Sequence, residues 1–113
     1  MRARPLAFAL AALLAAPATA PAFAQVVTGD AVAGGTMART WCANCHVVGP
    51  GQAATPATGD AAPTFASVVA RPETTALSLS VFLQTPHHRM PDYSLSRNEI
   101  ADLVAYILSL RGR

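Results

Sequence analysis

The stretch WCANCH, Trp41 to His46, contains both cysteines of this 113-residue chain and one of its three histidines. Two thiols three residues apart, followed at once by a histidine, allow a redox dithiol, part of a zinc site, or the attachment point of a prosthetic group. These chemistries differ in the compartment, the further ligands and the size of core that they need. The rest of the chain therefore decides between them.

The first 24 residues read as a secretory signal rather than as part of a fold. Arg2 and Arg4 precede an apolar run, and small residues follow up to Ala24. This order of charge, apolar run and A-x-A site is typical of a cleaved signal peptide. We expect cleavage after Ala24, with Ala20 as the second choice and an uncleaved membrane anchor as the alternative.

Cleavage would leave residues 25–113, enough for one small domain. It also removes two of the eight basic residues, so the mature chain balances six acidic residues with six arginines and contains no lysine. No clustered basic patch supports nucleic-acid binding. A domain of this size has little interior of its own and usually needs a disulfide, a metal or a cofactor.

The first two chemistries are poorly supported. A disulfide between Cys42 and Cys45 would close a very small loop and constrain little of the unfolded chain. A redox C-x-x-C normally follows a strand of a βαβ unit, and nothing strand-like precedes Cys42. Zinc would need His87 and His88 from some 40 residues away, and His46 is too close to Cys45 to ligate the same ion without strain.

The remaining interpretation uses every residue of the motif. In C-x-x-C-H, two thiols add to the vinyl groups of a haem and the histidine lies under the iron. Such a haem would supply the missing core, so we expect the chain without haem to be largely unfolded. The second axial ligand would come from PHHRMP: Met90, held in a non-helical loop by Pro91, or one of the neighbouring histidines.

The flanking sequence predicts helices and no strands. Ser96 and Glu99 form a capping box before apolar residues at helical spacing, which predicts a helix over residues 96–110. Asp30 can cap a helix that runs toward Cys42. Two further segments have helical patterns: residues 75–84 and, more briefly, residues 65–70. The segment between His46 and Pro63 is rich in Gly, Pro, Ala and Thr and is expected to be a loop that wraps the haem.

Taken together, an early CxxCH, a later MP and the closing LSRNEIADLVAYILSL resemble a class I c-type cytochrome of the small bacterial, periplasmic kind. The resemblance covers nearly all of residues 29–110. It implies an all-α cytochrome c fold, with three main helices and a short one around a single haem. It also implies a crossing of the first and last helices at Gly34 or Gly35 and at Tyr106.

The same resemblance implies the site residues. Cys42 and Cys45 would carry the thioethers, and His46 and Met90 would be the axial pair. In the family a proline carbonyl accepts a hydrogen bond from the proximal histidine. Pro63 is the candidate for this role, and Pro50 and Pro56 are the alternatives.

The function expected from these residues is one-electron transfer between periplasmic redox proteins, such as a dehydrogenase, a reductase or a terminal oxidase. The protein would be a monomer and not an enzyme. The alternative is a haem protein with an open sixth position that senses or transforms a small ligand. Arg71 and Arg89 are candidates for pairing with haem propionates, and His87 and His88 for contact with a partner.

Overall fold

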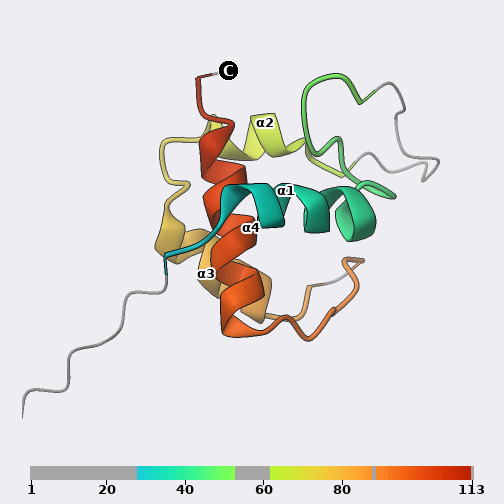
Figure 1. Ribbon diagram of the computed structural model, residues 1–113, viewed down its shortest axis with the longest axis vertical. Helices are drawn as coiled ribbons and strands as arrows, with labels where there is room; N and C mark the ends of the chain where they lie inside the picture. The colour runs from blue at the N-terminus through green and yellow to red at the C-terminus, as the bar shows by residue number, and fades with distance from the viewer. Residues whose placement is uncertain (1–27, 53–61, 88, 113) are drawn as a thin grey trace, which may run out of the picture.

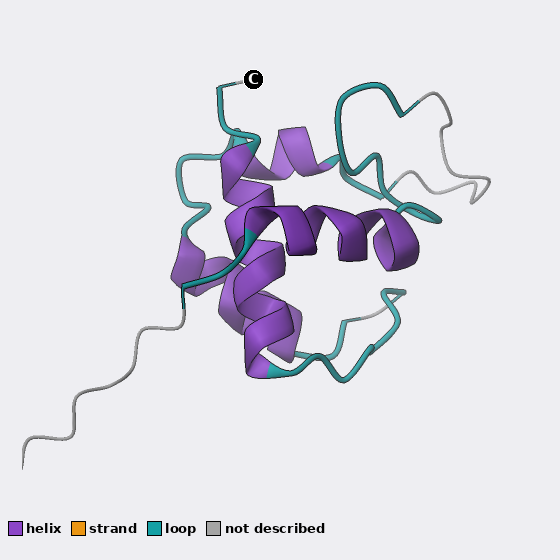
Figure 2. Cartoon of the chain, viewed as in Figure 1, coloured by secondary structure: helices purple, strands orange, loops and turns teal. Residues whose placement is uncertain are grey.

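The computed structural model describes residues 28–52, 62–87 and 89–112 of the chain. This described part is helical and contains no strand, only an isolated bridge between His87 and Met90 (Figure 2). In chain order its elements are α1 (Ala31–Met37), the π-helical turn η1 (Ala38–Cys42), α2 (Phe65–Val69), α3 (Ala76–Gln84) and α4 (Arg97–Ser109). The predicted all-α fold, with three main helices and a short one, is confirmed.

Side-chain caps begin the three main helices, and two of these caps, Asp30 and Ser96, are the ones that the sequence predicts. Asp30 accepts hydrogen bonds from the backbone N–H groups of Val32, at 2.7 Å, and Ala33, at 3.2 Å. Thr75 caps α3, and the predicted capping box of α4 is present in full, with Ser96 and Glu99 each bonded to the other's backbone. These bonds satisfy N–H groups that a helix otherwise leaves unpaired in its first turn.

The turn η1 extends α1 as a wider coil that ends at Cys42. The N–H of Ala43 donates to the carbonyl of Ala38 at 3.0 Å, a bond that spans five residues rather than four. Wider turns of this kind inside helices often occur at functional sites. Here the turn carries Trp41 and Cys42 at its end.

Helices α1 and α4 cross in close contact, with α1 passing over α4 at a steep angle (Figure 1). A Cβ atom on Gly34 would overlap the backbone carbonyl of Asp102 in α4, so the backbones approach more closely than any larger residue allows. On the next residue, Gly35, a Cβ would lie 2.9 Å from the ring of Tyr106. The predicted crossing therefore uses both glycines, Gly34 against backbone and Gly35 against the aromatic ring.

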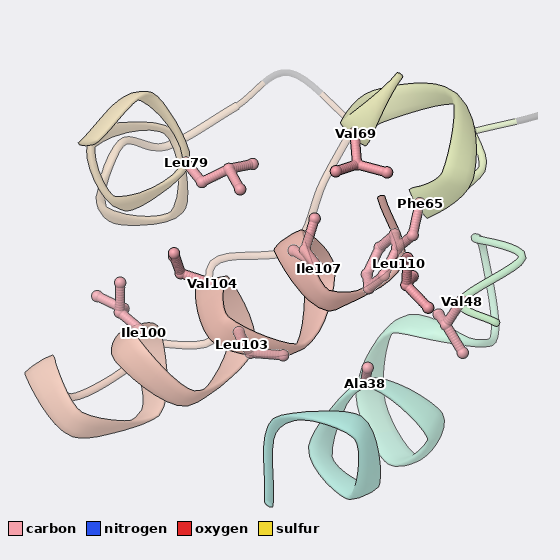
Figure 3. Packing of buried hydrophobic residues seen from close by; sticks show 10 residues of the cluster. All are labelled: Ala38, Val48, Phe65, Val69, Leu79, Ile100, Leu103, Val104, Ile107 and Leu110. Carbon is pink, nitrogen blue, oxygen red and sulfur yellow. The ribbon is translucent and has the colours of Figure 1, made fainter. Parts of the chain in front are cut away.

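The core lies along one face of α4. Figure 3 shows Phe65 and Val69 of α2 and Leu79 of α3 directed toward this face. Its buried members share near-complete exclusion from solvent: Ala38, Val48, Phe65, Val69, Leu79, Ile100, Leu103, Val104, Ile107 and Leu110. All of them have small or medium-sized side chains except Phe65, so the protein core is thin.

The expected signal peptide, residues 1–24, lies outside the described residues, as does most of the loop between His46 and Pro63. Within the described ranges, no helix is long and apolar enough to cross a membrane.

Candidate functional site

The residues from Cys42 to His46 form a tight turn at the end of η1. The carbonyl of Cys42 accepts hydrogen bonds from the N–H groups of Cys45, at 3.1 Å, and His46, at 2.8 Å. Both cysteines are half-buried, and their thiols are not bonded to each other. The turn therefore holds two free thiols and an imidazole within five consecutive residues.

The electrostatics of this turn oppose dithiol chemistry. Burial, and to a smaller extent the neighbouring Cys45, raises the pKa of the Cys42 thiol above its ordinary value. Reactive C-x-x-C motifs lower a cysteine pKa, commonly at a helix N-terminus, whereas Cys42 is the last residue of a helical segment. The Cys42 thiol therefore ionises less readily than an exposed cysteine.

The ring of His46 is oriented by a backbone carbonyl from much later in the chain. Its Nδ1 lies 2.7 Å from the carbonyl oxygen of Pro63. A carbonyl can only accept, so Nδ1 carries the proton and Nε2 keeps its lone pair. The ring also lies 5.5 Å from that of Phe65, tilted by 51°. Of the three prolines considered, Pro63 makes this contact; Pro56 lies outside the described residues.

Gln52 contacts the same turn from the other side, and no sequence motif pointed to it. Its side-chain oxygen accepts from the N–H of Val48 at 2.8 Å, and its side-chain nitrogen donates to the carbonyl of His46 at 3.0 Å. A longer bond of 3.4 Å reaches the carbonyl of Ala43. One amide side chain therefore satisfies backbone groups on three residues of the turn and the segment after it.

Met90 lies in the segment that connects α3 to α4. Arg89 has a positive φ of 85°, an uncommon conformation for a residue other than glycine, and it turns the chain so that His87 and Met90 pair as a bridge. Met90 is half-buried and lines a small open hollow with Phe82, Leu83 and Leu95. The same hollow is also lined by the polar side chains of Thr85, His87 and Asp92.

Tyr93 joins the Met90 segment to the Cys42–His46 turn. Its ring stacks on that of Trp41, with centroids 5.8 Å apart and planes 12° from parallel, and its hydroxyl donates to the Trp41 carbonyl at 3.1 Å. No sequence motif selected Tyr93. An aromatic residue three positions after Met90 was the only available signal.

These residues fit a c-type haem better than a metal ion alone. The donor set comprises two unbonded thiols, an imidazole with its Nε2 lone pair available, and the thioether of the half-buried Met90. No group of three or more His, Cys, Asp or Glu side chains within the described ranges could hold a metal ion. The zinc interpretation therefore has no support in this part of the chain.

Comparison with known proteins agrees with this donor set. The family model described as Cytochrome c matches residues 31–111. A curated protein named cytochrome c-552, from Bradyrhizobium diazoefficiens, is 46% identical over 94 residues, which cover 83% of this chain and 88% of that protein. No solved structure matches the chain at a significant level.

Proposed function

The chain belongs to the cytochrome c family, and we propose that it is a periplasmic one-electron carrier whose haem iron is ligated by His46 and Met90. Family membership establishes covalently bound haem c and a role in electron transfer. The axial pair, the compartment and the class of partner are the parts that we propose.

The observation that carries the proposal is the contact between His46 and Pro63. At 2.7 Å, the Pro63 carbonyl keeps the proton on Nδ1 and leaves Nε2 as the basic nitrogen. A hydrogen bond of this kind orients a ligating imidazole and increases its basicity. The side chain of His46 is thus prepared for ligation before any iron is present.

Two features support Met90 as the second ligand. It lines a hollow beside Phe82, Leu83 and Leu95, and its segment is joined to the Cys42–His46 turn through Tyr93 and Trp41. A thioether opposite an imidazole favours the ferrous state and raises the reduction potential, which suits a carrier. His87 is half-buried, and its ring packs against that of Phe82 with centroids 3.6 Å apart. This packing favours Met90 over His87 as the ligand.

Haem c supplies the redox centre, whose iron alternates between the ferric and ferrous states. The chain's own residues do the rest. Cys42 and Cys45 would fix the cofactor covalently, Pro63 holds the proton on Nδ1 of His46, and Met90 would supply the second axial ligand. We propose other periplasmic redox proteins as donor and acceptor, with the protein acting as a monomer.

The test is the visible spectrum of protein purified from a host that matures c-type cytochromes. We expect a c-type pyridine haemochrome, a weak ferric sulfur-to-iron charge-transfer band, and no rapid binding of carbon monoxide to the ferrous protein. Rapid binding to the native ferrous protein would instead indicate an open sixth position, and with it a ligand sensor or an enzyme.

Replacing the proposed ligand sharpens this test. Met90→Ala should abolish the charge-transfer band and allow rapid carbon monoxide binding, because the sixth position is then open. Met37→Ala is the matched control: Met37 lies in α1 and packs against the core, so its loss should leave the band intact. Survival of the band in Met90→Ala would show that another residue ligates the iron.

A further inference from the structure

The segment between α3 and α4 contains the proposed sixth ligand, and its described residues, 85–87 and 89–96, form no helix or strand. Within it, Met90 pairs with His87 and the N–H of Ser94 donates to Asp92 at 2.8 Å, and both contacts are local. Local contacts shape a loop but do not fix its position relative to the rest of the domain. At the end of the segment Leu95 packs against the core, and the Trp41–Tyr93 contact joins the segment to the residue before Cys42.

The contact between Trp41 and Tyr93 spans 52 residues of sequence and has two components. The rings stack with centroids 5.8 Å apart, and the Tyr93 hydroxyl donates to the Trp41 carbonyl at 3.1 Å. Each partner is close in sequence to a proposed haem contact: Trp41 precedes Cys42, and Tyr93 follows Met90 by three residues, a span of at most about 10 Å. The pair therefore limits how far Met90 can move from the cysteine turn.

Tyr93 is also placed so that it can release this contact. Its side chain is 42% exposed, so rotation into solvent would leave no large cavity behind. The hydrogen bond joins two uncharged groups, and its net stabilisation is modest. The contact is thus strong enough to bias the loop and weak enough to open without unfolding the domain.

We infer that the stacked pair of Trp41 and Tyr93 is a latch that holds the Met90 segment closed, which makes Tyr93 a positioning residue for the sixth ligand. The inference deepens the proposed function and rests on ligation by Met90. With the latch removed, the loop opens more often and small molecules compete with the thioether for the sixth position. The apparent affinity for such a molecule rises in proportion to the open population.

The test is a titration of the ferric holoprotein with imidazole, in which binding is measured by the loss of the sulfur-to-iron charge-transfer band. Tyr93→Phe keeps the ring and removes the hydroxyl, so we expect about fivefold tighter imidazole binding. Tyr93→Ala removes the stack as well, and we expect about 30-fold tighter binding. Ile107→Val is the matched control, because it loosens the buried core without contact with the latch and should leave imidazole affinity unchanged.

The outcomes separate the latch from the function on which it rests. Suppose that the native ferric protein shows the band and that both Tyr93 variants bind imidazole with wild-type affinity. This result would refute the latch and would leave ligation by Met90 supported. Equal tightening in Ile107→Val would assign the effect to general destabilisation and also overturn the latch. A native protein that lacks the band and binds carbon monoxide rapidly overturns the proposed ligation, and the latch with it. If Tyr93→Ala does not fold, Tyr93→Phe alone decides.

Discussion

Gly34→Ala is the substitution to which the crossing of α1 and α4 should be most sensitive. The new Cβ would overlap the carbonyl carbon and oxygen of Asp102 and would lie 3.0 Å from the N–H nitrogen of Leu103. All of these atoms belong to the backbone of α4, which cannot rotate away as a side chain can. Relief requires α1 to move away from α4.

Two opposing terms set the size of the effect. Alanine is favoured over glycine inside a helix by about 1 kcal/mol, which would stabilise α1. Forcing an extra carbon into a packed contact costs about 1–3 kcal/mol, and more where no side chain can yield. Because the clash is with backbone, we take the upper end of this cost, about 3 kcal/mol, which leaves a net loss of about 2 kcal/mol in the free energy of unfolding. Such a loss lowers the melting temperature of a domain of this size by roughly 10 °C.

Thermal unfolding of the ferric holoprotein, monitored by circular dichroism, measures this loss. Gly35→Ala should cost less, because its Cβ meets the ring of Tyr106 at 2.9 Å and a ring can tilt. Val32→Ala, on the exposed face of the same helix, should change stability by less than about 0.5 kcal/mol. A Gly34→Ala protein that melts at or above the wild-type temperature would refute the close crossing, because helix propensity would then outweigh any clash.

Two further predictions concern the capping box of α4 and the hydrogen bonds that Gln52 makes to the turn after Cys42. Hydrogen bonds from Ser96 lower the pKa of Glu99 in the folded protein below its ordinary 4.5, so the stabilisation they provide is complete above that pH and is lost as the pH falls through the folded value. Denaturation at a series of pH values should show a shallower acid decline for Glu99→Gln; an unchanged pH profile would contradict this assignment. Gln52→Ala leaves the buried N–H of Val48 without its partner and should cost about 1–3 kcal/mol by chemical denaturation, whereas Gln84→Ala, at an exposed helix position, should cost little. Equal stabilities of these two variants would show that the hydrogen bonds of Gln52 do not stabilise the fold.

The helices were predictable because their signals are local. Asp30, Thr75 and Ser96 cap helices within three residues of themselves, and the apolar spacing after Ser96 identifies the buried face of α4. The wider turn η1 was not predicted, because the choice between bonds of four and five residues depends on small differences in packing. The turn nevertheless follows the predicted direction and leads to Cys42.

The residues that carry the chemistry of the candidate site were predictable from the sequence, whereas most of the residues that position them were not. The motif from Cys42 to His46 is contiguous, so its meaning could be read from spacing alone. Pro63 was one of three candidate prolines, and only the folded chain brings its carbonyl to 2.7 Å from His46. Gln52 and Tyr93 carry no motif, and their contacts depend on where the loops lie.

By itself, the sequence determined that this is a small helical domain that binds haem, because caps, apolar periodicity and CxxCH act over a few residues. The tertiary structure alone decided how His46 is oriented and how the Met90 segment is held. Those contacts join residues 17 and 52 positions apart. Their geometry follows from the packing of α1, α2 and α4 and from the path of the connecting loops, which no local pattern encodes.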